Sequence, residues 1–129
     1  MKLLAISLGI QSGWAFSPDH KKNRVISGTI DMGKSHYQGM INELSEQYHP
    51  DRIALVAEGK ITAVFGSASK ISTIFTTADI RKFATGRKNG SVKRMLAEYR
   101  RLFDSEPVNV AEAEAFFALA KLAMSVKGE

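Results

Sequence analysis

Four polar side chains lie at positions where a protein commonly builds a site. Ser7 ends an apolar run close to a glycine, and Glu58 ends the apolar run RIALVAE. Glu112 and Glu114 stand near the start of the last helical pattern. A carboxylate at the end of an apolar strand requires hydrogen-bond partners or water. A serine can act as a nucleophile, but no histidine follows Ser7 at a suggestive position, so a small core residue is the simpler interpretation.

Basic residues dominate the segment 81–101. The chain has a net charge of +5 and a pI near 9.6, and Glu98 is the one acid in this segment. Its basic residues are Arg81, Lys82, Arg87, Lys88, Lys93, Arg94, Arg100 and Arg101. Because phosphates are bound mainly by Lys and Arg, the segment predicts a polyanionic partner. A solvated helix face is the alternative interpretation.

Length and composition predict a single domain over residues 1–129. The chain has 129 residues, of which 44% are hydrophobic, as expected for one globular core. The absence of cysteine excludes a disulfide framework and thiolate metal sites. The apolar runs are shorter than a membrane span, and the first lacks the basic start of a signal peptide. We therefore expect a cytoplasmic protein without a membrane partner.

The first half of the sequence predicts the strands that position Ser7 and Glu58. An antiparallel meander is expected from strands over 3–8, 14–16 and 24–32, with tight turning at Gly9 and Gly13 and a polar loop over 17–23. Apolar residues then recur at helical spacing, which predicts a helix from Ser35, its expected N-cap, to His49. Pro50 stops that helix. The run over 52–58 then predicts a strand parallel to the first.

The second half predicts helices. The apolar residues of 61–75 have a mixed spacing that favours a helix. Residues 76–86 are expected to be irregular, and residues 87–90 to form a basic loop. Ser91 is the expected cap of a helix through Phe103. Asn109 and Glu112 resemble a capping box that opens a final helix to about Val126. Phe65 and Phe83 are interpreted as core residues rather than as platforms for base stacking.

Four segments, in order, resemble the RuvC family of Holliday junction resolvases, and the first resembles its short phage members especially. AISLGIQSGWA is similar to a first strand that typically ends in Asp-Leu-Gly before Gly-Trp-Ala, and ALVAE to the strand that carries a catalytic Glu. EAEAFFALA is similar to the closing Glu-Ala-Asp-Ala helix. DIRKFATGRKNGSVKRM resembles the Val-Lys-Lys, Thr-Gly, Gly-x-Ala-x-Lys segment and places on its pattern Ile80, Lys82, Gly86, Gly90 and Lys93.

This resemblance implies an RNase H-like α/β fold, with a mixed sheet of a three-strand antiparallel meander plus a parallel strand, flanked by helices. It also implies a cluster of four carboxylates that binds two Mg²⁺ ions, or Mn²⁺, for the cleavage of branched DNA. The family pattern has Asp at position 7, Glu at 58, and Asp at 111 and 114. This sequence has Ser7, Glu58, Ala111 and Glu114.

Glu58 and Glu114 are thus the candidate metal ligands, and Ser7 and Glu112 complete the candidate catalytic set. A neutral Ser7 cannot offset or bridge two cations as a carboxylate would, so catalysis is expected to be weakened or lost. A capping role is the alternative for Glu112, and a favourable acidic position in the first turns of a helix is the alternative for Glu114. The DNA-binding residues that we expect are Lys82, Arg87, Lys88, Lys93 and Arg94.

The segment between Glu58 and the basic residues is shorter than in the bacterial resolvases. A shortened sheet edge is therefore expected, which puts the family's homodimer in doubt. A phage member would act in the cytoplasm of its host.

Three functions remain open from the sequence. The first is a junction-processing nuclease with a weakened Mg²⁺ site, and the second is a non-catalytic protein that binds structured nucleic acid. The third is a YqgF-type RNA-processing nuclease, which ranks lower because its Asp-Glu-Arg-type motif is missing. Actin-like sugar kinases need two domains and do not fit this length.

Overall fold

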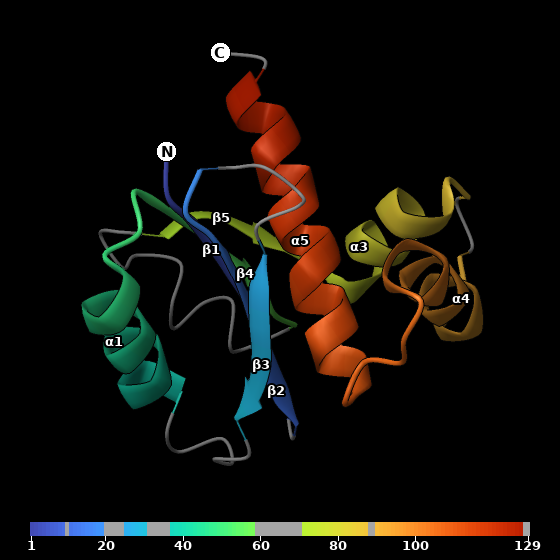
Figure 1. Cartoon of the computed structure of the whole chain (residues 1–129), viewed down its shortest axis with the longest axis horizontal. Coiled ribbons are helices and arrows are strands. Elements are labelled where there is room, and N and C mark those ends of the chain that lie inside the picture. The colour runs from blue at the N-terminus through green and yellow to red at the C-terminus, as the bar shows by residue number, and fades with distance from the viewer. Residues whose placement is uncertain (10, 20–24, 31–36, 59–70, 88–89, 128–129) are drawn as a thin grey trace.

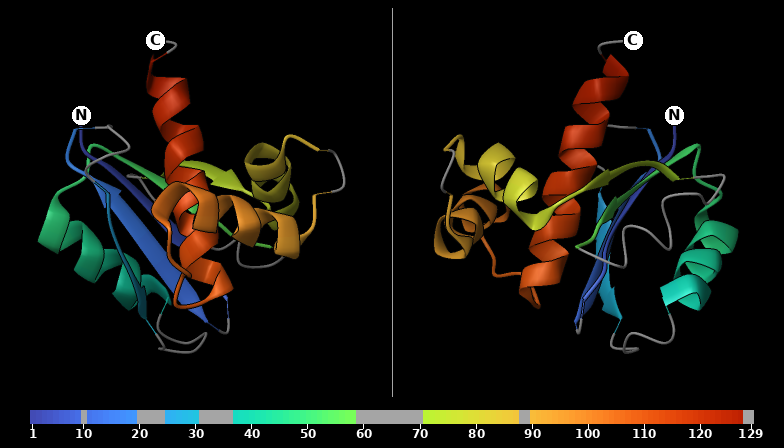
Figure 2. Two further views of the ribbon diagram at one scale, coloured as in Figure 1. Left: turned by 45° about the vertical axis from the view of Figure 1, so that its right-hand side comes forward. Right: turned by 180° about the vertical axis from the view of Figure 1, so that it is seen from behind.

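Five strands form one mixed sheet with helices on both faces (Figures 1 and 2). The computed structural model of the chain describes residues 1–9, 11–19, 25–30, 37–58, 71–87 and 90–127. The strands are β1 (Leu3–Ser7), β2 (Ser12–Ser17), β3 (Ile26–Ile30), β4 (Arg52–Val56) and β5 (Ile71–Phe75). The helices are α1 (Tyr37–Tyr48), α3 (Thr77–Thr85), α4 (Val92–Phe103) and α5 (Val110–Lys127).

The strand order β3-β2-β1-β4-β5 places β1 at the centre of the sheet. β1 is antiparallel to β2 and parallel to β4, and β2 is antiparallel to β3. The predicted meander and its parallel fourth strand are therefore confirmed. Ser7 at the end of β1 lies between Gly13 of β2 and Val56 of β4.

Helix α1 covers one face of the sheet. Its Tyr37, Met40, Ile41 and Leu44 recur at helical spacing and are buried. They pack in one cluster with β-strand side chains that include Leu4, Ile6, Phe16 and Leu55. After α1, His49 adopts a left-handed conformation with φ 47°, which ends the helix immediately before Pro50, as predicted.

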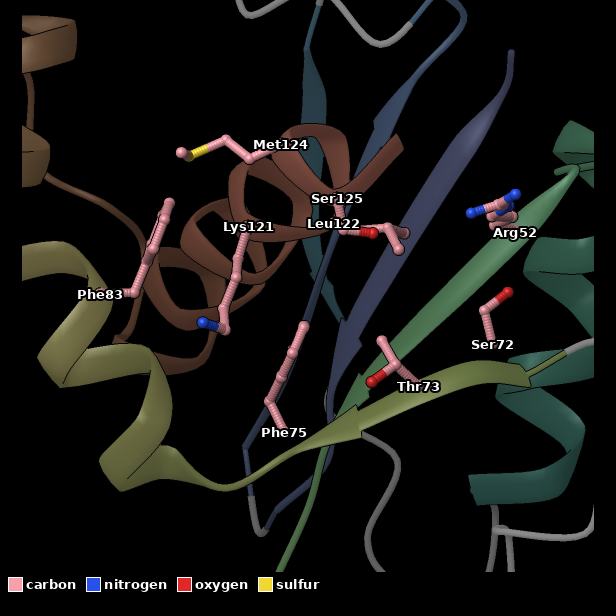
Figure 3. Close-up of a pocket in the computed structure, with 9 residues that line it drawn as sticks. All are labelled: Arg52, Ser72, Thr73, Phe75, Phe83, Lys121, Leu122, Met124 and Ser125. Carbon is pink, nitrogen blue, oxygen red and sulfur yellow. The ribbon is translucent and has the colours of Figure 1, made fainter. Parts of the chain in front are cut away.

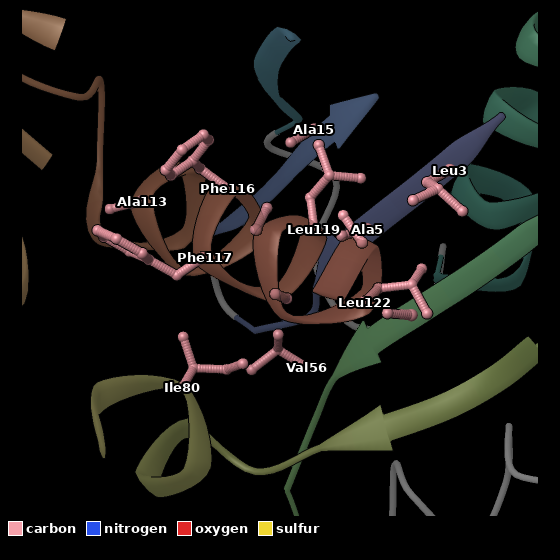
Figure 4. Close-up of a cluster of buried hydrophobic side chains, with 14 of the residues drawn as sticks. Leu3, Ala5, Ala15, Val56, Ile80, Ala113, Phe116, Phe117, Leu119 and Leu122 are labelled. Atoms are coloured by element: carbon pink, nitrogen blue, oxygen red, sulfur yellow. The ribbon is translucent and has the colours of Figure 1, made fainter. Parts of the chain in front are cut away.

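Helix α5 crosses the opposite face, and α3 and α4 pack against it (Figures 2 and 4). Its side chains alternate small Ala residues with Phe116, Phe117, Leu119 and Leu122, and all of these are buried. Small side chains let the helix lie close to the sheet. At the nearest point a Cβ on Gly13 would lie only 2.4 Å from the amide nitrogen of Glu112. Gly13 is therefore part of β2 and a close-approach residue, rather than the turn residue that the sequence suggested.

The segment after β4 differs from the sequence-based prediction. Ile71–Phe75, predicted as the end of a helix, forms β5 parallel to β4 at the edge of the sheet. The parallel edge thus keeps a fifth strand, because β-branched and aromatic side chains of ISTIF fit a half-buried sheet position. The remainder of the predicted helix, the predicted cap Ser35 and most of the predicted loop over 17–23 lie outside the described residues.

Residues 76–86 are helical rather than irregular. Thr76 caps α3 by accepting a hydrogen bond from the Asp79 amide, and the Asp79 carboxylate accepts one from the Thr76 amide, which completes a capping box. Gly86 ends the helix with φ 70°, a left-handed conformation that glycine adopts without strain. Ser91 caps α4 as predicted. Of the described helices, none is both long and apolar enough to cross a membrane.

Candidate functional site

The Ser7 side chain meets the Glu114 carboxylate between β1 and α5. The Ser7 hydroxyl donates a hydrogen bond to Glu114 Oε1 at 3.2 Å, and both residues are buried, with 2% and 7% of their surfaces exposed. Ser7 is on the α5 side of the sheet because it alternates with Leu4 and Ile6, which face α1. Position 7, which carries an Asp in the RuvC pattern, thus holds a neutral hydrogen-bond donor. The buried carboxylate of Glu114 beside it accepts a hydrogen bond from this donor.

Glu58 follows β4 and contacts the start of α3. Its Oε1 accepts hydrogen bonds from the Thr77 amide at 2.7 Å and from the Thr77 hydroxyl at 2.8 Å. The first amide groups of a helix have no partner within the helix, and the helix dipole makes this end positive. A carboxylate is therefore favoured at this position, and Glu58 fixes α3 relative to the end of β4.

Glu112 is engaged at the start of α5, as the alternative interpretation from the sequence expects. Its amide donates to Asn109 Oδ1 at 2.9 Å, and its Oε1 accepts from the Val108 amide at 2.9 Å. Its Oε2 accepts from the Ser27 hydroxyl of β3 at 3.3 Å. Glu112 thus contacts β3 and the residues that precede α5, whereas Glu114 contacts β1.

Arg81 of α3 belongs to the same site as Glu114. Its charge acts on the Glu114 carboxyl, and its Nε is buried without a hydrogen-bond partner among the described residues. The sequence analysis placed Arg81 in the basic segment but assigned it no role in a site. Two signals could have identified it: its position next to the buried Ile80, and its spacing of four residues from Thr77.

The electrostatic environment of Glu114 disfavours its charge. Burial raises the pKa of the Glu114 carboxyl above its ordinary value, and the charge of Glu58 raises it further. The hydrogen bond from Ser7 and the charge of Arg81 act in the opposite direction and lower the pKa. The net shift is upward, so burial is the dominant effect.

The donor set does not fit a pair of hard divalent cations. Mg²⁺ and Mn²⁺ need several anionic oxygens that converge on one point. Within the described part of the chain, no three Asp, Glu or His side chains converge in this way. Ser7 directs a proton at Glu114 rather than a negative charge at a metal, and Glu58 Oε1 already accepts two hydrogen bonds. The positive charge of Arg81, which acts on the Glu114 carboxyl, also disfavours a further cation there.

The basic residues that were predicted to bind DNA lie on α3, on α4 and between them. Lys82, Arg87, Lys93 and Arg94 are exposed, and none of them forms an ion pair with another described residue. By contrast Arg100 is paired with Glu106, and Arg101 with Glu98, each at 2.8 Å. Lys88 lies outside the described residues. We call the four exposed residues Lys82, Arg87, Lys93 and Arg94 the α3–α4 cationic surface.

A cavity of about 630 Å³ lies beside β5, under the last turns of α5 (Figure 3). The Lys121 ammonium lies 5.5 Å from the ring centre of Phe75 and 5.3 Å from that of Phe83. Phe83 is partly buried and packs against the core, as predicted. Neither Glu58 nor Glu114 lines this cavity, so it is separate from the site at the ends of β1 and β4.

Comparisons with known proteins give structural matches only. No protein-family profile matches the chain, and no curated protein matches its sequence. A structure of Thermus thermophilus RuvC is similar with a TM-score of 0.64 and 13% identity, covering 99% of this chain and 97% of that chain. T. thermophilus RuvC in complex with a Holliday junction substrate is similar with a TM-score of 0.65 and 12% identity, covering 99% and 96%.

These matches show that the chain has a RuvC-like fold of the RNase H-like class. The predicted α/β architecture, with a mixed sheet flanked by helices, is confirmed.

Proposed function

We propose that this protein binds branched DNA in the manner of a RuvC-type resolvase, with Mg²⁺-dependent cleavage that is weakened or lost. The observation that carries the proposal is the fold, which the chain shares over nearly its whole length with a RuvC structure bound to a Holliday junction substrate. The α3–α4 cationic surface supports it, because exposed cations without ion-pair partners among the described residues are available to phosphates.

The reduced carboxylate set supports the loss of cleavage. Hydrolysis by two metal ions requires ligands that hold both ions near the scissile phosphate. Ser7 and Ala111 supply no negative charge, and the Glu114 carboxylate accepts a hydrogen bond from Ser7. Glu112 is committed to Val108 and Ser27. Binding through phosphate contacts needs none of these carboxylates, so it can persist where hydrolysis does not.

Two alternatives differ in the nucleic acid or in its processing. A non-catalytic protein would bind structured nucleic acid and never cut it, and a YqgF-type nuclease would process RNA.

We also propose that the protein is a phage-type member, because the opening segment AISLGIQSGWA resembles the short phage members. Such a protein would act in the cytoplasm of the host.

A homodimer on the junction is a further part of the proposal. Sedimentation of the protein with and without a junction tests it.

Gel-shift titrations on a four-way junction and on a linear duplex of the same sequence test the binding. We expect tighter binding to the junction, and equal affinity for both DNAs would overturn the proposal. An RNA of matched structure that binds more tightly than DNA would favour the YqgF-type alternative.

Cleavage is measured on the same junction with Mg²⁺ and with Mn²⁺. We expect little or no cutting by the wild type. Robust cutting that Glu58→Gln abolishes would show that hydrolysis is retained. The Ser7→Asp variant, measured beside the wild type, reports whether one restored carboxylate increases the rate.

A further inference from the structure

We propose that a groove between β5, α3 and the last turns of α5 binds unpaired nucleotides of a DNA strand. Phe75 and Phe83 stack on bases there, and Lys121 contacts the phosphates. The inference deepens the proposed function, because it names the part of the DNA that this face of the molecule contacts. It rests on that function only for the choice of DNA as the ligand.

The groove consists of two adjoining cavities. The first is the cavity of about 630 Å³ beside β5 (Figure 3). The second has a volume of about 280 Å³ and is lined by Asp79, Lys82, Phe83, Gly86 and Lys121. Because Phe83 and Lys121 line both cavities, the two are parts of one depression, which we call the β5–α5 groove.

Two aromatic rings of this groove lie within reach of one bound group. The Lys121 ammonium is 5.5 Å from the ring centre of Phe75 and 5.3 Å from that of Phe83, so it stands close to both (Figure 3). Both rings are partly buried and pack against the core cluster, which fixes them, while part of each remains in the groove. Fixed aromatic rings suit stacking on nucleobases, because every base has a π face.

The charge of the groove favours a polyanion. Arg52, Lys82 and Lys121 are the cations among its lining residues, and Asp79 is the acid. The Asp79 carboxylate already accepts a hydrogen bond from the Thr76 amide at 3.1 Å, as part of the cap of α3. Lys121 forms no ion pair with another described residue. Its ammonium is therefore available to a phosphate next to a stacked base.

The groove continues into the α3–α4 cationic surface, which favours a nucleic acid strand over an acidic peptide. Lys82 belongs to both, and Gly86 of the groove directly precedes Arg87 of the surface. Arg87 and Arg94 line a further cavity between α3 and α4. A line of cations that passes two aromatic rings matches a ligand that repeats a phosphate and a base in every unit.

One end of the groove lies beside the candidate site. The Phe75 carbonyl accepts a hydrogen bond from the Ala57 amide at 3.0 Å, and Ala57 directly precedes Glu58. Two residues after Phe75, Thr77 donates to the Glu58 carboxylate. A DNA branch bound over this end of the sheet would therefore place an unpaired strand at the groove.

Titrations with two labelled oligomers of equal length test the stacking. One is a thymidine oligomer, and the other has the same backbone with abasic sites. We expect the wild type to bind the thymidine oligomer at least about tenfold more tightly. Phe83→Leu should weaken that binding about fivefold or more and leave the abasic affinity unchanged. Phe103→Leu is the matched control, because Phe103 is an exposed phenylalanine that lines neither cavity.

The phosphate contact is tested with Lys121→Gln. This variant should bind both oligomers more weakly, and the slope of log K against log salt should fall by about 0.7, the value for one phosphate contact on a single strand. Lys2→Gln removes the same charge from an exposed lysine outside the groove and should leave the slope near the wild-type value. Equal slopes for Lys121→Gln and the wild type would contradict the contact.

Methionine methyl NMR of the wild type tests the location without any substitution. Met124 lines the groove and has 59% of its surface exposed, so a base that stacks there should shift its methyl signal when the thymidine oligomer is added. Met40 is the internal control, because it is buried on the α1 face of the sheet. A Met124 signal that stays unchanged at saturation would overturn the inference, even if the Phe83→Leu variant does not fold.

The remaining outcomes separate the ligand and the two proposals. Equal wild-type affinities for the thymidine and abasic oligomers would overturn the inference. A glutamate- and phenylalanine-rich peptide that displaces the thymidine oligomer at lower concentration than unlabelled oligomer would assign the groove to a protein partner instead. Binding of the thymidine oligomer that depends on Phe83, in a protein with no preference for a junction, would remove the proposed function and leave the inference. A junction preference without any dependence on bases would do the reverse.

Discussion

The backbone of Ala111 at the start of α5 lies directly against Gly13 in β2. A Cβ built on Gly13 would be 2.6 Å from the Ala111 carbonyl oxygen and 2.5 Å from its carbonyl carbon. Real Cβ atoms do not approach backbone this closely, so the helix would have to move away from the sheet. Because Glu114 lies on the next turn of α5, this contact also sets the distance between Glu114 and Ser7.

Gly13→Ala is therefore expected to destabilise the protein by about 3 kcal/mol, the upper end of the usual cost of overpacking. Urea unfolding measures the change. Gly39→Ala in α1 is the control, because a Cβ there meets no atom within 4 Å and Ala is the better helix former. That variant should gain about 0.5 kcal/mol. A Gly13→Ala variant as stable as the wild type would show that α5 can shift at little cost.

Glu114→Gln is expected to increase stability at neutral and alkaline pH. Burial raises the pKa of Glu114 in the folded state, so folding favours its protonated form. The stability associated with this group is fully present below its unfolded pKa and is lost as the pH rises through the raised folded value. Gln resembles the protonated form and keeps an acceptor for Ser7, so it avoids that loss. Urea unfolding from mildly acidic to alkaline pH should show the two proteins diverging as the pH rises.

The positive charge of Arg81 limits the stability that Glu114→Gln is expected to gain, because its attraction for the Glu114 carboxylate is lost in the variant. The charges that act on Glu114 are Arg81, which lowers its pKa, and Glu58, which raises it. If Glu114→Gln is instead less stable than the wild type at high pH, the attraction of Arg81 outweighs the burial of the charge.

Much of the fold could be predicted because its strongest signals are local. Alternating and helical patterns identified β1, β4, α4 and α5, and the four segments that resemble RuvC gave the order of the sheet. The error at α3 was avoidable, since Thr76 and Asp79 form a capping box and Gly86 a C-terminal glycine. β5 was harder, because a short apolar run of strand length does not distinguish a strand from a piece of helix.

The candidate site was less predictable because it depends on contacts between residues far apart in the chain. The pair Ser7 and Glu114 is separated by 107 residues, and only the resemblance brought the two together. The two signals for Arg81, its place next to Ile80 and its spacing from Thr77, have meaning only once residues 76–86 are taken as a helix, because they depend on which face of α3 meets β4. Gly13, expected in a turn, instead allows α5 to pack closely on β2, which the sequence does not show without the position of α5.

Asp79→Asn is expected to cost about 1 kcal/mol at neutral pH, a typical value for a lost helix cap. The Asp79 carboxylate accepts from the Thr76 amide at 3.1 Å, and this bond, with that of the Thr76 side chain, lowers the Asp79 pKa below its ordinary value of 3.8. A lowered pKa contributes stability above the unfolded value, and that stability is lost as the pH falls through the folded value. The wild type and Asp79→Asn should therefore converge in acid.

Chemical unfolding between neutral pH and strongly acidic pH measures this convergence. Asp104→Asn is the control, because Asp104 is exposed and has a φ of 54°, a conformation that Asn also tolerates. Parallel curves for the wild type and Asp79→Asn over the whole range would show that the cap does not depend on the charge of Asp79.

Single substitutions on the α3–α4 cationic surface are expected to weaken junction binding and to change its salt dependence. If Lys82, Arg87, Lys93 and Arg94 contact phosphates, each change to Gln should reduce the slope of log K against log salt by about 0.9. The loss should be similar on every DNA structure, because phosphate contacts carry no base sequence. Arg101→Gln removes the same charge but from a side chain whose guanidinium already bonds to Glu98 at 3.0 and 2.8 Å. It should leave the slope near the wild-type value. A slope that falls equally for Arg101→Gln would mean that net charge, and not this surface, determines binding.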